Sequence, residues 1–544
     1  MPEPERLLRR LRSSPPSVSL PLSQERRDAS STISVTLLLV LALPRVVRLL
    51  YPLVWVEDDF YLESAWLVSA GFRPYLDFVH PHLPILELTV APYLKLVGAN
   101  HLSIEILNEA VLYLNSLLTW RLGTNFASRR VATAASILYA FSSLVFRFHV
   151  YERENFIAAL MLGASLIAIR DSARGTLLGM RLLALTVLLL LACSIKLTAV
   201  ISSLVILVWL AAVRRRLNEA FACAAGLAAG LMALTAALYL HYGFEFLLQT
   251  MLFHFMKGAD TRGSLAAYPA AILDVLIPLI GLGLIHIAGD LRDLSRRPTL
   301  VLVLGLAIAN YLFFGFLSPT AWAHNYLDFL PFLALIGALG LDRVLAALSD
   351  LVAGSVQSQA RPWLWAIGGS AGILLSMSFI APLVNENWIF GSVYGFGFVP
   401  REEISAIAEA IRSYAPDHEP IIAPSFIAFE ANRPLLVAFP ETYGVYRQAQ
   451  ERWREQGFVR ARDSMRGADF FELIASTAHW WTDQMRAAIS DHQVNVVVPD
   501  SELQTLALVR APLAPVSDAF LLANGFSPAL RTVHYTVWTR PRPR

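Results

Sequence analysis

Charged residues are scarce in this chain of 544 residues, making up 16% of it against about 25% in a typical soluble protein. Hydrophobic residues make up 56%, and the mean hydropathy is +0.52. So much apolar surface excludes a soluble globular enzyme and a disordered chain, and it leaves lipid as the environment of most of the protein. The small formal net charge of +2 implies no nucleic-acid partner.

Cysteine and lysine are also rare. The two cysteines, Cys193 and Cys223, both lie in apolar runs. They support neither a disulfide framework nor a metal cluster, and they assign no redox compartment. Lys95, Lys196 and Lys257 are the only lysines among 44 basic residues, so a lysine in this chain is an exception among arginines.

The chain consists largely of successive apolar runs. Residues 1–32 are rich in arginine, proline and serine, which predicts a basic cytoplasmic tail without a cleavable signal. A helix needs about 20 apolar residues to cross a bilayer. The fold class that we expect is therefore mostly α, a polytopic membrane protein with about 11 transmembrane helices. The expected spans are 33–50, 103–120, 131–147, 155–169, 182–195, 197–213, 219–240, 268–288, 299–317, 325–345 and 363–381.

The basic residues predict how the chain is oriented. A cytoplasmic N-terminus places most arginines of the membrane region in inner segments, as in other membrane proteins. This orientation requires the apolar segment 84–98, which contains Glu87 and Lys95, to be a helix at the membrane edge and not a span. We therefore expect an integral membrane protein, in a bacterial inner or plasma membrane, with residues 33–384 as its transmembrane domain.

The composition changes after Pro382, where charged residues and proline reach the frequencies of a soluble domain. An odd number of spans places residues 385–544 outside. This part of the chain predicts a small α/β extracytoplasmic C-terminal domain. Its expected elements are a helix over 402–414, short buried strands at 420–424 and 494–499, and an alternating strand over 532–539.

The first outer loop, residues 51–101, is unusually long, and long ordered loops are commonly functional. It begins with three adjacent acids, Glu57, Asp58 and Asp59, followed by a predicted helix from about Phe60 to Ser69. Neighbouring carboxylates at the mouth of a membrane bundle favour a proton acceptor. The alternative is a solvated helix N-terminus, where acids complement the helix dipole.

The pattern of this loop resembles a known family. The residues that carry the resemblance are Glu57, Asp58, Asp59, Tyr61, Gly71, Pro74, Tyr75, Asp77, Phe78, His82, Pro84 and Gly98. They resemble the GT-C glycosyltransferases, most closely the branch with the dolichyl-phosphate-mannose protein mannosyltransferases and the aminoarabinose transferase of lipid A. The family's loop usually opens with Asp-Glu, whereas this one opens with Glu-Asp-Asp, which leaves the catalytic acid open among the three.

Three later segments are similar to the same family, so that the resemblance covers 33–381 but not the outer domain. They contain Arg153-Glu154 in HVYERENF, Lys196 in SIKLTAV, and His324, Tyr326 and Pro331 in AHNYLDFLPFLAL.

The resemblance implies a reaction. Such enzymes transfer a sugar from a polyprenyl-phosphate donor to an acceptor at the outer face of the membrane, with inversion at the anomeric carbon and with a first-loop acid as general base. Asp58 is our first candidate for the base, before Asp59 and Glu57. Glu154 or Glu152 would assist by positioning the acceptor or a cation. The acceptor is a hydroxyl of a lipid, glycan or protein.

Several residues are candidates for substrate binding, each with a structural alternative. Lys196 would contact the donor phosphate or extend to the membrane interface. His80 and His82 would bind phosphate or acceptor, or pack structurally. Lys257 and Arg262 would meet phosphate or sugar, or lie solvated in their loop. The remaining candidates are Tyr61, Arg73, Tyr75 and Asp77 in the first loop, and His324 and Tyr326 beside the donor cavity.

No cofactor is indicated. A divalent cation held by His80, His82 and the acids is conceivable, but the spacing His-Pro-His is not a metal-ligand motif. Two other functions fit a protein with many spans: a flippase or transporter of lipid-linked sugars, and a polysaccharide polymerase. A transporter would concentrate its polar residues near the membrane midplane, whereas here they gather at outer loops. A non-catalytic membrane scaffold remains a further alternative if the loop acids are not essential.

Overall fold

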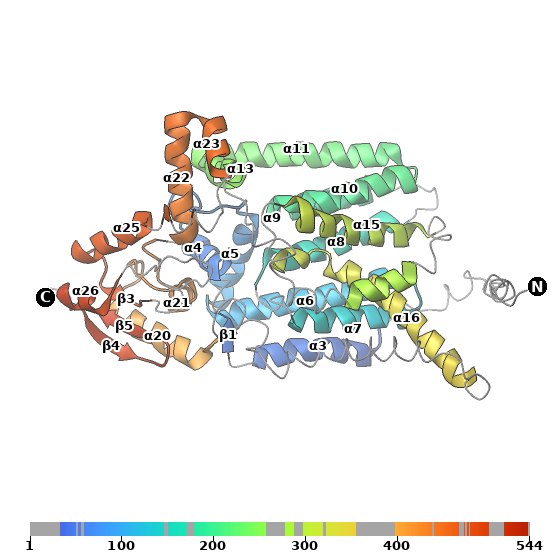
Figure 1. Cartoon of the computed structure of the whole chain (residues 1–544), viewed down its shortest axis with the longest axis horizontal. Helices are drawn as coiled ribbons and strands as arrows, with labels where there is room; N and C mark the ends of the chain where they lie inside the picture. Colours follow the sequence, from blue (N-terminus) through green and yellow to red (C-terminus); the bar gives the residue numbers. More distant parts are fainter. Residues whose placement is uncertain are drawn as a thin grey trace, which may run out of the picture.

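The computed structural model contains a bundle of helices capped at one end by the first loop and the C-terminal part of the chain (Figure 1). The ranges that it describes are 33–50, 53–55, 59–145, 151–170, 179–256, 278–287, 297–318, 323–354, 398–437, 440–466, 473, 476–477, 479–499 and 516–541.

Long helices lie side by side along the long axis of the molecule (Figure 1). In chain order they are α3 (Val35–Leu50), α6 (His101–Gly123), α7 (Arg129–Val145), α8 (Arg153–Ile169), α9 (Gly179–Ile195), α10 (Val200–Val208), α11 (Leu217–Tyr242), α15 (Pro298–Leu312) and α16 (Leu330–Gly354). Short helical turns continue several of them: η2 (Leu197–Ala199), η3 (Trp209–Val213), η6 (Phe313–Leu317) and η7 (Ala323–Tyr326). These helices occupy the positions of most expected spans.

By length and composition, α11 is the one described helix that could cross a membrane by itself. Shorter apolar helices are Gly179–Ile195, Leu197–Val213, Pro278–Ile287 and Pro298–Leu312. The expected span 363–381 and much of 268–288 lie outside the described residues, so the number of eleven spans stays a prediction.

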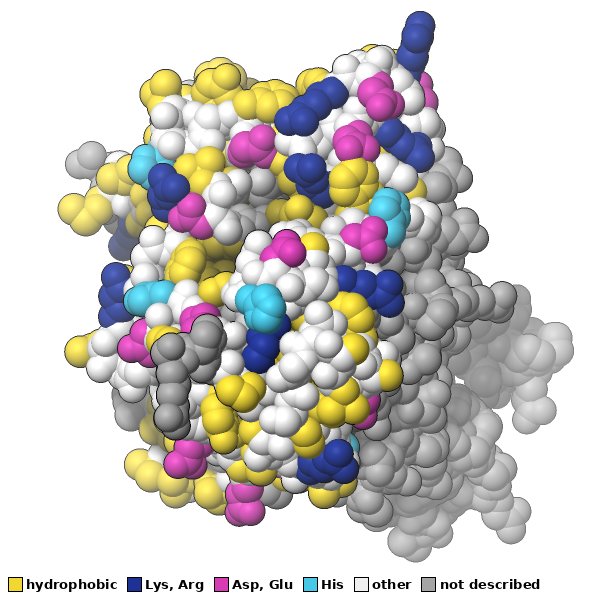
Figure 2. Space-filling view, turned by 90° about the vertical axis from the view of Figure 1, so that its left-hand side faces the viewer, with side chains coloured by type: hydrophobic (Ala, Val, Ile, Leu, Met, Phe, Trp, Pro, Cys, Tyr) yellow, Lys and Arg dark blue, Asp and Glu magenta, His cyan; other side chains and the backbone are white. Residues whose placement is uncertain are grey.

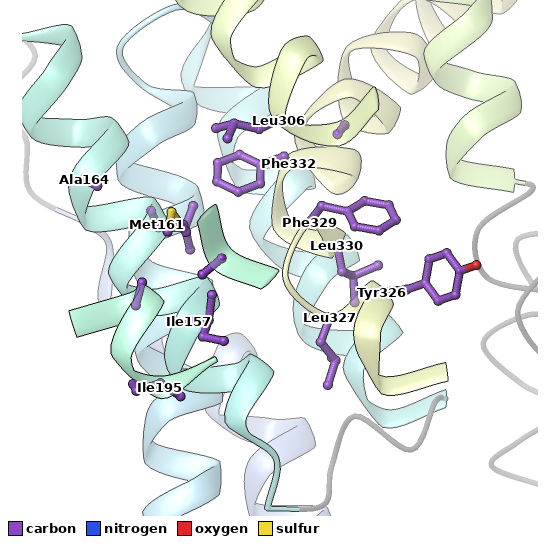
Figure 3. Packing of buried hydrophobic residues seen from close by; sticks show 14 of the residues in the cluster. Ile157, Met161, Ala164, Ile195, Leu306, Tyr326, Leu327, Phe329, Leu330 and Phe332 are labelled. Carbon is purple, nitrogen blue, oxygen red and sulfur yellow. The ribbon is translucent and has the colours of Figure 1, made fainter. Parts of the chain in front are cut away.

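The bundle core is a continuous cluster of buried apolar side chains. Figure 3 shows part of it, where Ile157 and Met161 of α8 lie in one cluster with Leu306 of α15 and Phe329 and Phe332 near the start of α16. In a lipid environment such packing stabilises the bundle by van der Waals contact, since lipid tails are as apolar as the side chains.

Two helices of the first loop lie across one end of the bundle, which we call the loop end. The first is α4 (Asp59–Ser69) and the second is α5 (Ile85–Val97). Gly71, with φ of 99°, follows α4, and Gly98, with φ of 90°, follows α5. Both glycines adopt the positive φ that other residues disfavour. The loop helix and the membrane-edge helix expected from the sequence are therefore both present as helices.

The C-terminal part of the chain covers the loop end (Figure 1). Its helices are α20 (Arg401–Tyr414), α21 (Ser425–Ala431), α22 (Pro440–Gln456), α23 (Phe458–Arg466), α25 (His479–Ser490) and α26 (Asp518–Ala523). An antiparallel sheet of order β3-β5-β4 contains β3 (Val496–Val497), β4 (Ser527–Arg531) and β5 (Thr536–Thr539).

Two expected strands differ from the structure. Residues Ile421 and Ile422 form only isolated bridges, and the prolines at 420 and 424 explain this because proline donates no ladder hydrogen bond. The strand expected over 532–539 is only β5, because Thr532 and Tyr535 close a turn in front of it, with Thr532 N donating to Tyr535 O at 2.9 Å. The turn joins β5 to β4, which the sequence did not predict.

A small strand pair fastens the C-terminal part to the first loop. Strand β1 (Leu53–Trp55), just before the acidic triplet, pairs antiparallel with β2 (Phe398–Pro400). Arg401, the next residue, forms an ion pair with Glu105 of α6, and Glu105 also binds Arg48 of α3 at 3.1 Å. The domain boundary at residue 384 therefore stays a prediction. In the structure, the β1–β2 pair joins the two parts beside the acidic triplet.

Candidate active site

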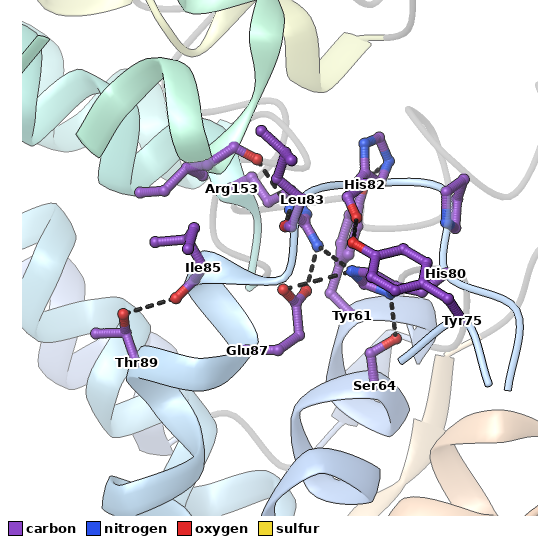
Figure 4. Close-up of polar contacts among 12 residues, drawn as sticks. Tyr61, Ser64, Tyr75, His80, His82, Leu83, Ile85, Glu87, Thr89 and Arg153 are labelled. Carbon is purple, nitrogen blue, oxygen red and sulfur yellow. Dashed lines mark hydrogen bonds and ion pairs between the residues drawn. The ribbon is translucent and has the colours of Figure 1, made fainter. Parts of the chain in front are cut away.

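Arg153, at the start of α8, is the centre of a buried polar cluster at the loop end (Figure 4). Its side chain is closed to solvent and forms an ion pair with the equally buried Glu87 of α5. The guanidinium also donates to the carbonyl oxygens of Leu83, at 3.2 Å, and Ile195, at 2.9 Å. These contacts join α5, α8 and the end of α9 at one point.

The ring of Tyr61 on α4 lies against the same guanidinium, with 4.6 Å between Arg153 Cζ and the ring centroid. The hydroxyl of Tyr61 lies 3.2 Å from His82 Nε2. This places the first loop helix in contact with the start of α8 through a cation–π interaction. Tyr61 thus connects the helix that follows the acidic triplet to the buried cluster.

The two histidines of the His-Pro-His segment both face this cluster (Figure 4). Nε2 of His80 lies 3.5 Å from the Glu87 carboxylate, and its Nδ1 lies 3.4 Å from Ser64 Oγ. Burial lowers the pKa of the His80 imidazole, although Glu87 opposes this. Burial, with Arg153 nearby, holds the pKa of His82 well below its usual range. Both imidazoles are therefore neutral near pH 7 and act as hydrogen-bonding groups.

The backbone of this loop is held by residues that follow α11. Gln249 accepts from the His80 amide at 2.9 Å and donates to the Tyr75 carbonyl at 3.0 Å. The ring of His254 makes a 2.7 Å hydrogen bond to the carbonyl of Pro81. Tyr75 itself adopts a φ of 68°, and its hydroxyl donates to the His82 carbonyl. The loop is thus held by the segment that follows α11 and by a contact within the loop itself.

A second group of charged side chains adjoins the first. Lys196, which follows α9, forms an ion pair with Glu154 and donates to Asn325 Oδ1 at 2.7 Å. Asp328, fully buried just before α16, is close enough to Glu154 and Lys196 to interact electrostatically with both. Arg153 and Glu154 are consecutive, and Arg153 binds the carbonyl next to Lys196. Both groups therefore belong to one site.

The predicted site residues divide into those that meet in this site and those that do not. Tyr61, Tyr75, His80, His82, Glu154 and Lys196 take part in the contacts above. Glu152 is fully buried beside them at the N-terminus of α8.

Arg73 and Asp77 instead pair with each other at 2.9 Å on the surface, where Arg73 is 61% exposed. Tyr326 packs in an aromatic group with Phe314 and Phe329. Arg73 and Asp77 therefore lie in a surface turn and not in the cluster. The residues Glu57, Asp58, Lys257 and Arg262, and the side chains of Asp59 and His324, lie outside the described part of the chain.

Sequence reasoning missed several residues of the site. In the sequence Glu87 serves only as a charge that argues against a span, and Ser64, Gln249, Asn325 and Asp328 are not among the predicted site residues. The available signal was an acid within an apolar segment, as with Glu87 in α5 and Asp328 before α16. Within the described ranges, no group of three or more His, Cys, Asp or Glu side chains is arranged to hold a metal ion.

Comparison with known proteins gives a match in structure but not in sequence. No family model matches the chain, and no curated protein matches it. The fold is similar to that of ArnT, an aminoarabinose transferase, from Cupriavidus metallidurans, in the apo state and bound to undecaprenyl phosphate. Each of these two comparisons gives a TM-score of 0.59 and 15% identity, and covers 93% of this chain and 97% of ArnT.

A second similar structure is the apo oligosaccharyltransferase of Archaeoglobus fulgidus, with a TM-score of 0.50 and 13% identity. That match covers 88% of this chain and 71% of the other. ArnT and this oligosaccharyltransferase are both members of the GT-C superfamily. The fold of the chain is therefore a GT-C fold, which confirms at the level of structure the resemblance identified from the first loop.

Proposed function

We propose that this chain is an integral-membrane glycosyltransferase that transfers a sugar from a polyprenyl-phosphate donor to a hydroxyl of a lipid, glycan or protein acceptor. The observation that carries the proposal is the buried cluster of Arg153, Glu87, Glu154 and Lys196 at the loop end of a GT-C fold. Buried charges are costly, and in a membrane protein they mark functional sites. The cluster adjoins the helix that begins at the acidic triplet.

The leaving group in this reaction is a lipid phosphate, which requires cations or hydrogen-bond donors. Lys196 supports this role because its ammonium group has three donors, and two of them are used by Glu154 and Asn325. Within the described part of the chain these are the two acceptors that the ammonium group contacts, which leaves its third donor for a phosphate oxygen. Arg153 is a positioning residue in this proposal, since its guanidinium already binds Glu87 and two backbone carbonyls.

The nucleophile is a hydroxyl, whose proton must be removed as the bond to the sugar forms. We assign this step to a carboxylate of the first loop, Asp58 first and Asp59 or Glu57 next. Attack occurs opposite the departing phosphate, so that the anomeric carbon is inverted and the proton passes to the carboxylate. The neutral imidazole of His82, hydrogen-bonded to Tyr61, would orient the donor or acceptor.

The same proposal includes the location of the protein. The chain would lie in a bacterial inner or plasma membrane with its N-terminus in the cytoplasm. The loop end and residues 385–544 would face outward. The positions of the described helices along the bundle and the basic residues of the inner segments support this orientation.

The decisive experiment is sugar transfer in membranes that contain the full chain. Polyprenyl phosphates carrying radiolabelled sugars are supplied, and the wild type is compared with Asp58→Asn, Asp59→Asn and the control Lys95→Met, which alters an exposed residue of α5. Loss of a general base is expected to lower transfer by about 10²–10⁴-fold in one aspartate variant. Unchanged transfer in both variants would overturn the mechanism. Absence of transfer from every lipid-linked sugar by the wild type would overturn the function.

A further inference from the structure

Helices α22 and α23 project sideways from the C-terminal part, across the end of α11 (Figure 1). Helix α23 packs against α22 and against α13 (Phe253–Met256), a short helix that follows α11. Polar contacts fix this arrangement. Tyr446 of α22 donates to Glu245, and Gln450 donates to the same carboxylate at 3.3 Å. These contacts hold α22 against the segment that follows α11, and α22 runs across the direction of α11 in Figure 1.

An exposed apolar strip runs from α11 onto α23. Leu240 of α11 is 84% exposed, and Val459 of α23 is 58% exposed. Aromatic contacts connect them, because Trp453 lies 5.6 Å from Phe244 and 5.1 Å from Phe458 between ring centroids. Phe255 of α13 is also exposed. The strip thus continues the lipid-facing side of α11 beyond the end of that helix.

Arginines accompany this strip. Together α22 and α23 contain six arginines, at 447, 452, 454, 460, 462 and 466, against four acids, at 441, 451, 455 and 463, so that the two helices have a net charge of +2. Arg454, Arg460 and Arg466 are exposed, and none of the three has an ion-pair partner among the described residues. Seen face-on, the upper part of this end of the molecule, where α22 lies in Figure 1, has Lys and Arg side chains among apolar and acidic ones (Figure 2).

We propose that α22 and α23 rest on the bilayer surface and bind anionic lipid. In this arrangement Leu240, Phe244, Phe255 and Val459 enter the boundary between head groups and acyl chains, and Arg454, Arg460 and Arg466 bind lipid phosphates. Basic amphipathic helices bind membranes by this combination of apolar burial and attraction to anionic lipid. The charge of the segment and its continuity with α11 favour a lipid surface as the occupant over a protein partner.

The inference rests on the proposed membrane location and not on the proposed chemistry. Loss of lipid contact and loss of sugar transfer are therefore separate outcomes. The test places the full chain in lipid nanodiscs with an environment-sensitive dye on Val459→Cys. Nitroxide-labelled lipids then report by quenching whether the dye lies within the bilayer. The wild-type chain serves as the labelling blank, because both native cysteines are buried.

A matched control is available. Leu522 of α26 is also 58% exposed, and α26 lies at the far end of the molecule from the bundle (Figure 1). We expect shallow nitroxides to quench the dye on Val459 and not a dye on Leu522→Cys. Each arginine at an anionic surface contributes about fivefold to binding. Quenching at Val459 should therefore be stronger in discs that contain phosphatidylglycerol than in discs of phosphatidylcholine alone.

The arginines are tested separately. The triple variant Arg454→Gln, Arg460→Gln, Arg466→Gln should lose the gain from phosphatidylglycerol. Arg462→Gln should keep it, since that guanidinium pairs with Asp463 at 2.8 Å. Quenching at Val459 no greater than at Leu522 overturns the proposal and leaves a protein partner as the occupant of the strip. Equal quenching in both lipids overturns the assignment of the arginines to lipid phosphate.

Discussion

Arg153 and Glu87 form an ion pair in which neither side chain is exposed to solvent. The pair connects the start of α8 to α5, and Tyr61 of α4 covers it from the side of the first loop. A buried ion pair contributes little net stability compared with apolar residues, but the loss of one partner leaves an uncompensated charge. Removing one partner therefore costs more than the intact pair contributes, so that the geometry of the cluster depends on both residues.

The first prediction follows from that asymmetry. Glu87→Gln should lower the free energy of unfolding by about 3–5 kcal/mol, because it leaves the Arg153 guanidinium buried without its counter-ion. The double variant Glu87→Leu, Arg153→Met should recover part of the loss. Thermal unfolding in detergent measures both effects, with Arg73→Gln at an exposed pair as the control. Equal melting temperatures for the wild type and Glu87→Gln would contradict this account.

The second prediction concerns Lys196. If its free donor binds the donor phosphate, Lys196→Met should reduce transfer by about 10–100-fold, the value of a lost charge-assisted hydrogen bond. Because the phosphate gains negative charge as it leaves, the effect should appear in kcat as well as in KM for the lipid-linked sugar, and Lys196→Arg should restore part of it. Lys95→Met is the matched control, since it removes an exposed lysine from α5. Identical donor kinetics in Lys196→Met and Lys95→Met would refute the assignment.

The third prediction is a dependence of stability on pH. Burial raises the pKa of the Glu63 carboxyl on α4 well above its usual 4.5, and the nearby Leu435 amide opposes this only in part. Above pH 4.5 the unfolded chain releases this proton while the folded chain keeps it. This group therefore lowers stability by about 1.4 kcal/mol for each pH unit until the raised pKa is reached.

Glu63→Gln mimics the protonated acid and should remove that contribution. Relative to the wild type, the variant should gain stability between pH 5 and pH 7 and show no gain at pH 4. Unfolding curves across this range test the sign, with Glu409→Gln as an exposed control. A difference between Glu63→Gln and the wild type that does not change with pH would show that folding does not raise the pKa of Glu63.

Local features of the first loop could be predicted from the sequence. The helix after the acidic triplet, the glycine at its end and the membrane-edge helix depend on nearby residues, whose propensities and turn requirements are visible in sequence. The partners of the site could not be predicted in this way. Glu87 and Arg153 are 66 positions apart, and His80 and Gln249 are 169 positions apart. Only the packing of the bundle brings such residues together.

Arg73 and Asp77 are residues that the sequence assigns to the site and the structure places outside the buried cluster. Asp77 belongs to the pattern that resembles the GT-C family, and both residues are predicted to bind substrate. They are four positions apart, however, and pair with each other at the surface. Their backbone contact, from Arg73 N to Asp77 Oδ2 at 2.7 Å, closes a local turn. A residue within a functional motif can thus shape the loop without reaching the buried cluster.

The final prediction concerns how the C-terminal part supports the first loop. The carboxylate of Glu105 binds Arg48 and Arg401 at once, and these arginines flank the pairing of β1 with β2. Glu105→Gln should weaken the pairing by about 3 kcal/mol, since both guanidinium groups lose their counter-ion. Hydrogen exchange at the amide of Val54, which pairs with Val399, should then accelerate by at least about tenfold. Because β1 directly precedes the acidic triplet, transfer should fall in kcat with little change in KM for the donor.

Glu402→Gln, an exposed change in the first turn of α20, should alter neither the exchange rate nor kcat. Faster exchange with unchanged kcat would mean that the β1–β2 pair holds the two parts together without positioning the catalytic acid.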